Sequence, residues 1–284
     1  MKQTIALVLS GGAARGLAHI GVIEELEKNN FEITSVAGNS MGAFIGAIYA
    51  AGRLSEFKEW ILNLGKTDIV KFADFTISPQ GFIKGEKIFK TLEAFLPDIN
   101  IEDLSLPYVA VSADIANHKE VVFRTGSLRQ AVRASIAIPA IFKPVNIGNA
   151  MLIDGGFVNP IPLNRVMRTV GDLLVGSFVN ADLPEPNLNN KPATKDSGKS
   201  RLKRLMSSSR NKDRINPLKI MSKSTGLLTY SLAMANIEKY NPDILINISR
   251  ESCGNFQFHR IEEMIEVGRI AAVTTLANQS VKVS

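Results

Sequence analysis

Cysteine is almost absent from this chain of 284 residues, in which Cys253 is the only one. A single cysteine excludes an internal disulfide and suits a reducing compartment, so we expect a cytoplasmic protein. We also expect no secretory signal, because only a short apolar run separates Lys2 from a glycine-rich loop at residues 10–16.

Long uncharged stretches are also scarce, and residues 33–52 are one that is long enough to test as a membrane span. This stretch contains Asn39, several hydroxyl side chains and several glycines, so we do not expect it to cross lipid. We interpret it instead as a buried strand, turn and helix. A hydrophobic content of 45% fits a globular protein with a full core.

Positive charge is concentrated in one segment. The net charge of the chain is +6, whereas residues 189–223 contain eleven Lys or Arg and two Asp, which gives +9 for this segment and −3 for the remainder. The segment is rich in Ser, Lys, Arg and Asn. We predict a basic flexible insertion at about residues 185–215.

The chain is organised around Gly38-Asn-Ser-Met-Gly42, which matches the pattern G-x-S-x-G. The apolar run before it predicts a strand, and the small apolar residues 43–51 after it predict a buried helix. A strand that turns sharply into a helix with serine at the turn is typical of the nucleophile elbow of serine hydrolases. Gly38 and Gly42 then keep the tight turn free of side chains, and Ser40 is the predicted nucleophile.

A glycine-rich loop, Ser10-Gly-Gly-Ala-Ala-Arg-Gly16, connects a predicted strand at 2–9 to a predicted helix at 17–28. Unpaired N–H groups at such a loop point toward one spot, so the arrangement suits a phosphate or an oxyanion. A P-loop is excluded, because Lys and Ser or Thr do not follow Gly16.

Two alternatives remain for this loop. A dinucleotide site requires glycine where Ala13 stands and an acidic residue at the end of the second strand, where the chain has the Ser40 elbow. An oxyanion hole serving Ser40 uses both motifs, because adjacent parallel strands would place the loop and the elbow side by side. We therefore favour the oxyanion hole.

The rest of the chain alternates strands with helices, which predicts a mostly parallel sheet covered on both faces within one domain. No internal repeat is visible. The further helices are expected at 55–64 with Ser55 as N-cap, 86–96, 128–134, 215–240 and 261–276. The further strands are expected at 106–115, 119–124, 151–154, 173–179 and 243–248, and the loop 72–85 is expected to form part of a cleft wall.

Asp154 is the second candidate catalytic residue. It follows a short apolar strand and precedes Gly155 and Gly156. A carboxylate held at a strand end by a glycine turn is well placed to meet a serine on a neighbouring strand. Together with Ala134-Ser135-x3-Pro139, the three motifs around residues 11–16, 38–42 and 154–156 resemble those of the patatin-like phospholipases, particularly the compact bacterial ones.

The resemblance covers residues 2 to about 180, and the last strand and helix also fit it. It implies a single patatin-like domain over residues 1–284 with a three-layer α/β/α fold. It also implies a serine lipid acyl hydrolase with a Ser–Asp dyad, in which Ser40 is the nucleophile and Asp154 accepts its proton. Hydrolysis would proceed through an acyl-Ser40 intermediate and would need no metal or organic cofactor.

The histidines agree with a dyad, because none of them is well placed for a triad. His19 lies among apolar neighbours and is expected to be a packed side chain. His118 lies in a predicted turn, and His259 lies just before the last predicted helix.

The resemblance also assigns the glycine-rich loop as the oxyanion hole. Arg15 matches a basic position of the family, where anchoring of the loop and direct charge stabilisation both remain open. Ala13 stands where glycine is common and favours negative φ, so the local geometry is an open point. The residues assigned to the oxyanion hole are Gly11, Gly12, Ala13, Ala14 and Arg15.

Alternatives to the hydrolase remain. Acyl transfer to an alcohol would use the same dyad, and a membrane-associated regulatory module would need no active dyad. The basic segment 191–223 could be a solvated loop or could bind an anionic membrane surface, at the inner membrane face. Nucleic acid is disfavoured because this segment contains no aromatic residue for stacking. The sequence does not indicate the oligomeric state.

Overall fold

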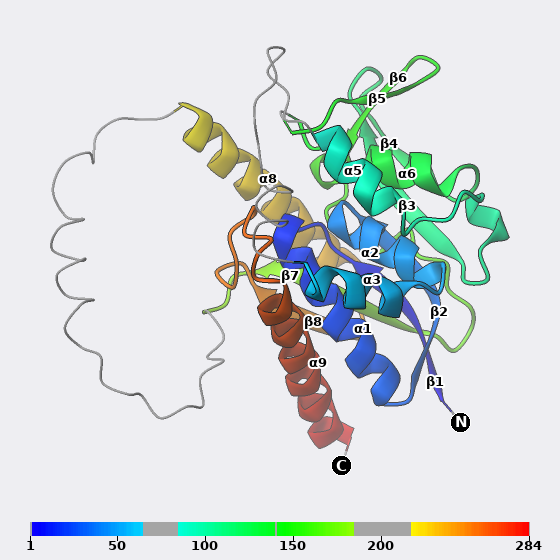
Figure 1. The fold of residues 1–284 in the computed structure, drawn as a ribbon. Coiled ribbons are helices and arrows are strands. Elements are labelled where there is room, and N and C mark those ends of the chain that lie inside the picture. The colour runs from blue at the N-terminus through cyan, green and yellow to red at the C-terminus, as the bar shows by residue number, and fades with distance from the viewer. Residues whose placement is uncertain (1, 65–84, 140, 185–216, 284) are drawn as a thin grey trace, which may run out of the picture.

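A mostly parallel sheet runs through the centre of the protein, which we describe from a computed structural model covering residues 2–64, 85–139, 141–184 and 217–283 (Figure 1). Within these residues the sheet has eight strands in the order β5-β6-β3-β2-β1-β7-β8, with β4 paired to β3. The strands are β1 (Gln3–Leu9), β2 (Phe31–Asn39), β3 (Tyr108–Asp114), β4 (Lys119–Phe123), β5 (Val145–Ile147), β6 (Ala150–Asp154), β7 (Leu173–Ala181) and β8 (Ile244–Ser249).

Parallel pairing joins β8, β7, β1, β2 and β3, whereas β4, β5 and β6 form the antiparallel part of the sheet. The α-helices are α1 (Ala18–Lys28), α2 (Met41–Ala50), α3 (Leu54–Leu62), α5 (Gly85–Glu93), α6 (Leu128–Ser135), α8 (Pro217–Tyr240) and α9 (Ile261–Val283). Short 3-10 helices are η1 (Ala13–Leu17), η2 (Ile101–Asp103) and η3 (Gly155–Phe157).

Side chains alternate between the two faces of the sheet along each strand, and helices cover both faces. On β1, Leu7 and Leu9 belong to a large apolar cluster that includes residues of α1, α2, α3, α6 and α9. Val8 belongs to a smaller cluster on the opposite face, together with Phe178 of β7 and Ala233 of α8. The predicted α/β/α arrangement is confirmed.

Helices α1 and α9 pack with their backbones in direct contact, and two glycines permit this approach. A Cβ atom at Gly268 would lie 1.9 Å from the carbonyl oxygen of Ala18, and one at Gly21 would lie 1.9 Å from that of Ile265. Neither position has room for any side chain. The contact holds the C-terminal helix against the helix that follows the glycine-rich loop.

The structure corrects three details of the prediction. Ser55 is not an N-cap: α3 begins at Leu54 with Arg53 in the cap position, because Gly52 turns the chain with a φ of 70° directly after α2. Strand β5, only three residues long, was not predicted and pairs with β6. The expected helical start at Leu17 is divided between η1 and α1.

Several predictions concern residues outside the described ranges. These are the cleft-wall loop at 72–84, the basic insertion at 185–215 and most of the segment 191–223. None of the described helices has a stretch long and apolar enough to cross a membrane.

Candidate active site

Ser40 occupies a sharp turn between β2 and α2, as the G-x-S-x-G pattern predicts. Its φ of 52° and ψ of −126° lie outside the regions that residues with a side chain prefer, so the turn holds the serine under backbone strain. The flanking glycines make this turn possible. A Cβ atom at Gly42 would lie 2.3 Å from the carbonyl oxygen of Leu9, and one at Gly38 would lie 2.4 Å from that of Gly42.

A buried hydrogen-bond relay supports the strained turn. The backbone N–H of Ser40 donates to Oγ of Ser135 at 3.0 Å, and the Ser135 hydroxyl donates to the carbonyl oxygen of Val111 at 2.6 Å. Ser135 is fully buried at the end of α6, and Val111 lies in β3. This residue therefore ties the elbow to both the neighbouring strand and a helix.

Asp154 lies at the end of β6, beside the elbow but not on a strand adjacent to β2. Strand β3 lies between them: Asn39 pairs with Val111 on one side, and Asp154 pairs with Ser112 on the other. The expectation of neighbouring strands is therefore wrong by one strand. The antiparallel direction of β6 is what returns its end to the elbow.

The environment of Asp154 raises its basicity. The side chain is 6% exposed, and burial raises the pKa of the carboxyl group from 3.8 to about 6, because a charge is costly away from water. The nearby Ser40 hydroxyl and the backbone N–H of Gly156 each lower the pKa by less. The Gly156 N–H lies 2.8 Å from Oδ1.

The second carboxylate oxygen of Asp154, Oδ2, is buried without a formed hydrogen bond among the described residues. The Ser40 hydroxyl lies close enough to the carboxylate to lower its pKa. Hydrogen bonds between a nucleophile and its base are often long in sites without substrate and shorten when the reacting complex forms.

Asn39 fills the space between the two loops that flank the serine. Its side chain is buried, and Nδ2 lies 3.5 Å from the carbonyl oxygen of Pro160. A Cβ atom at Gly11 would lie 2.6 Å from Nδ2, and one at Gly155 would lie 2.8 Å from Oδ1. The sequence did not single out Asn39, which occupies a variable position of the elbow pattern. The contacts explain why both loops need glycine.

The glycine-rich loop lies beside the elbow, as expected from the parallel pairing of β1 and β2, in which Leu9 faces Gly38. Its backbone N–H groups differ in whether they already donate a hydrogen bond. Those of Gly11 and Ala14 donate to the carbonyl oxygens of Pro160 and Asn255, each at 3.1 Å. The N–H of Arg15 donates within the loop to Gly12, also at 3.1 Å.

The N–H groups of Gly12 and Ala13 have no partner among the described residues. Ala13 has a φ of 49°, which an alanine adopts at a cost of about 1 kcal/mol. It also lines the same pocket as Ser40. Of the five residues assigned to the oxyanion hole, Gly12 and Ala13 therefore have N–H groups free to meet an oxyanion, whereas those of Gly11, Ala14 and Arg15 already donate to carbonyl oxygens.

The Arg15 side chain points toward backbone carbonyls and an amide, which favours the anchoring role. Nη1 donates to the carbonyl oxygen of Cys253 at 2.6 Å, Nε to that of Val179 at 3.1 Å, and Nη2 to Oδ1 of Asn180 at 2.8 Å. These bonds fasten the glycine-rich loop to β7 and to the segment that follows β8.

Of the three histidines, His19 lies nearest the loop in sequence, and it is a packed side chain as predicted. Its Nε2 and Nδ1 lie 2.9 Å from the carbonyl oxygen of Ser10 and from Oγ of Ser177. Complete burial lowers its pKa from 6.5 to about 4, so it is neutral near pH 7. His118 and His259 are exposed.

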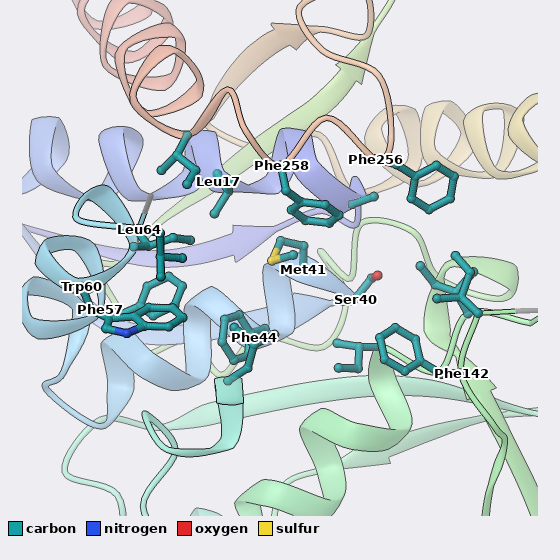
Figure 2. A pocket seen from close by; sticks show the side chains of 17 residues that line it. Leu17, Ser40, Met41, Phe44, Phe57, Trp60, Leu64, Phe142, Phe256 and Phe258 are labelled. Atoms are coloured by element: carbon teal, nitrogen blue, oxygen red, sulfur yellow. The ribbon is translucent and has the colours of Figure 1, made fainter. Parts of the chain in front are cut away.

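An apolar pocket opens beside Ser40 (Figure 2). Among the described residues that line it, the only polar side chain is that of Ser40, unless the indole nitrogen of Trp60 is counted. Figure 2 shows Met41 and Phe44 near the serine, with Phe57, Trp60 and Leu64 farther along the same side.

Aromatic side chains also flank the other end of the pocket. Figure 2 shows the Ser40 hydroxyl between Phe142 and the pair Phe256 and Phe258, which come from the segment after β8. The sequence interpretation missed these two phenylalanines, since they lie outside every motif. Among the described side chains, no group of three or more His, Cys, Asp or Glu is placed to hold a metal ion.

Comparison with known proteins adds the family context. A family model described as patatin-like phospholipase matches residues 7–167. An uncharacterised NTE family protein of Mycobacterium tuberculosis is 29% identical over 96% of this chain and 91% of its own length. Patatin-like phospholipase domain-containing protein 6 of Mus musculus is 36% identical over 64% of this chain, but only 14% of that protein is matched.

The fold is also found in a solved structure. The crystal structure of VipD from Legionella pneumophila superposes with a TM-score of 0.51 at 15% identity, covering 98% of this chain and 67% of VipD. At that identity the similarity concerns the fold alone. The family match, in contrast, spans the glycine-rich loop, the elbow and Asp154.

Proposed function

Because the chain belongs to the patatin-like phospholipase family, we propose that it is a serine lipid acyl hydrolase of the phospholipase A or lysophospholipase type. The observation that carries the proposal is the position of Ser40 on a strained turn, next to the buried carboxylate of Asp154 and at an apolar pocket. These three features would supply a nucleophile, a base and a site for an acyl chain.

In the first half of the proposed reaction, Oγ of Ser40 attacks the carbonyl carbon of a lipid ester while Asp154 accepts the hydroxyl proton. The N–H groups of Gly12 and Ala13 donate hydrogen bonds to the resulting oxyanion, and one such donor contributes about 3 kcal/mol to the transition state. The intermediate then collapses to acyl-Ser40. The alcohol leaves with the proton from Asp154, which regenerates the carboxylate.

In the second half, a water molecule attacks the acyl-Ser40 carbonyl and gives a proton to Asp154. Collapse releases the fatty acid, and the proton returns from Asp154 to Oγ of Ser40. The raised pKa of Asp154, about 6, supports this dual role. A carboxylate with an ordinary pKa is a weaker base for an alcohol.

The pocket favours an acyl chain over a charged group. The described residues of its lining are mainly aliphatic and aromatic and include no ionisable side chain, so a charged group among them would lose hydration without gaining a partner. We propose that the acyl chain lies along Phe44 and Phe57, with the alcohol portion of the lipid outside.

Two competing functions remain. An acyltransferase would use the same acyl-Ser40 but would pass the acyl group to an alcohol instead of water. A regulatory module without catalysis would not need a strained serine beside a buried base, so the geometry argues against it. We further propose a single catalytic domain over residues 1–284 that works in the cytoplasm. The basic segment 191–223 would attract it to an anionic membrane surface.

The test is release of fatty acid from phospholipid and lysophospholipid in mixed micelles, with products identified by mass spectrometry. We expect release by the parent protein and none by Ser40→Ala. Ser55→Ala, which alters an exposed serine on α3, is the matched control and should retain full activity. Equal release by Ser40→Ala and the parent would refute the proposal. Added glycerol separates the two enzymes, because a transferase would then form acylglycerol.

A further inference from the structure

Helix α8 differs along its length in how it contacts the rest of the protein. Its second half packs on the sheet: Ala233 is buried, and the ring of Tyr230 stacks on Phe178 with 6.3 Å between centroids. Nδ2 of Asn236 also donates to Oδ1 of Asn159 at 2.9 Å. None of the described side chains between residues 220 and 229 is buried. Figure 1 shows this first half extending beyond the body of the protein.

Several large apolar side chains are exposed on the first half of α8. Leu227 and Leu228 are 65% and 71% exposed, and Met221 is 69% exposed. Ile220, Leu227 and Met234 recur every seven residues, as do Met221 and Leu228, so two turns of helix separate the members of each row and the rows lie side by side. Exposed apolar residues gathered in this way mark an interaction surface, whereas scattered ones do not.

Charge around this face is positive. Lys223 is exposed within it, and no acidic residue occurs in the sequence between Asp213 and Glu238. The chain just before α8 contains the basic run described above. Helices that lie in a membrane interface combine such an apolar face with flanking Lys and Arg. The chemistry therefore matches an anionic lipid surface.

Helix α8 also contacts, through Tyr230 in its second half, the segment that contributes Phe256 to the pocket lining. The guanidinium of Arg250 sits 5.6 Å from the ring centroid of Tyr230, which joins α8 to the segment after β8. Phe256 of that segment lines the pocket and is 47% exposed. An apolar helix face and an exposed pocket residue thus belong to elements in contact.

We propose that the face of α8 formed by Ile220, Met221, Leu227 and Leu228 docks on an anionic phospholipid bilayer and holds the pocket at its surface. The apolar side chains would enter the interface while Lys223 contacts headgroups. This deepens the proposed function and rests on it for its purpose, but docking is a binding event that can be measured without hydrolysis.

A second copy of the chain is the main competing partner. Paired helices require a continuous apolar seam with spacing of three and four residues. On α8 the positions between the members of the first row are Ser224 and Ser231, which interrupt such a seam. Two hydroxyl groups are tolerated more easily in a headgroup layer than between helices, so the bilayer is favoured.

Flotation with vesicles tests the proposal, using the Ser40→Ala protein so that no lipid is consumed. We expect binding to phosphatidylglycerol-rich vesicles and much weaker binding to pure phosphatidylcholine. The double variant Leu227→Ser/Leu228→Ser should bind at least about tenfold more weakly, because two leucines no longer enter the interface. Lys223→Ala should lose about fivefold.

The matched control is Ile270→Ser/Val273→Ser on α9, which removes two exposed apolar side chains elsewhere and should leave binding unchanged. Equal vesicle binding by the α8 double variant and its parent would overturn the proposal. It would also be overturned if the parent bound no vesicles but formed a dimer, seen by light scattering, that the double variant did not form. Hydrolysis of a soluble short-chain ester, measured on proteins that keep Ser40, separates the docking proposal from the proposed function. If the parent does not hydrolyse the ester, the proposed function is contradicted. The α8 double variant is expected to lose flotation but to keep this hydrolysis.

Discussion

Replacing Asp154 with asparagine should remove activity and stabilise the protein, because the same buried carboxylate serves catalysis and costs folding energy. Asparagine keeps the oxygen that accepts from the Gly156 N–H but cannot take a proton from Ser40. Loss of a general base lowers the rate by at least about a hundredfold. The effect on stability follows from the raised pKa.

The magnitude comes from linkage between protonation and folding. The pKa of Asp154 rises from 3.8 in the unfolded chain to about 6 in the folded one. Because the pKa is raised on folding, the carboxyl group contributes most to the free energy of unfolding below pH 3.8, and this contribution is lost as the pH rises through about 6. The full loss amounts to about 3 kcal/mol.

Asparagine does not titrate, so its stability relative to the parent should grow with pH. Between pH 5 and pH 7.5 the advantage of Asp154→Asn should increase by about 1.4 kcal/mol, or about 2 °C in Tm for a chain of this length. Thermal unfolding of both proteins across this pH range measures the difference. Ser40→Ala is the control: it is also inactive but keeps the carboxylate and loses a hydroxyl that lowers its pKa, so it should lose stability with rising pH at least as steeply as the parent.

The pH dependence of the parent's activity should reflect the ionisation of the same Asp154 carboxylate. Since the base must be ionised, kcat/KM should fall about tenfold per pH unit below a pH of about 6. An Asp154→Asn protein whose Tm tracks the parent at every pH would refute the reasoning, as would a parent with full activity at pH 4.5.

Three further changes test packing, the elbow and the pocket. Gly268→Ala should lower Tm strongly, since its Cβ would lie 1.9 Å from the backbone of α1. The control Gly226→Ala, with nothing within 4 Å of its Cβ, should leave Tm unchanged or raise it slightly. Equal melting curves for the two variants would contradict the described packing of α1 on α9. Ser135→Ala removes the hydrogen bond to the Ser40 N–H and should cost about 1–3 kcal/mol in a denaturant melt, with a lower kcat; an unchanged kcat would show that the elbow needs no such support. Trp60→Ala should shift the preferred p-nitrophenyl ester toward longer acyl chains, because it enlarges the pocket, and an unchanged chain-length profile would place the acyl chain elsewhere.

Much of this arrangement could be predicted from local sequence signals. The elbow and the glycine-rich loop each follow a buried strand, and the parallel pairing of β1 and β2 brings them together as expected. The tight turns require glycine for reasons that a pattern can express. The alternation of strands and helices likewise predicted the parallel sheet.

The remainder depends on contacts between distant segments, which no local pattern contains. Phe256 and Phe258 reach the pocket because Arg15 and Ala14 bond to the segment after β8. The occupied N–H of Gly11 depends on where Pro160 lies in space. Ser55 has the residue type of an N-cap, but the turn at Gly52 already begins the helix.

The central claim is that Ser40 is the nucleophile, and labelling with a fluorophosphonate tests it most directly. The account predicts one adduct per chain, found by peptide mass spectrometry on the peptide that contains Ser40, and no adduct on Ser40→Ala. It also predicts much slower labelling of Asp154→Asn, because the hydroxyl then lacks its base. An adduct on another serine, or labelling that persists in Ser40→Ala, would contradict the account.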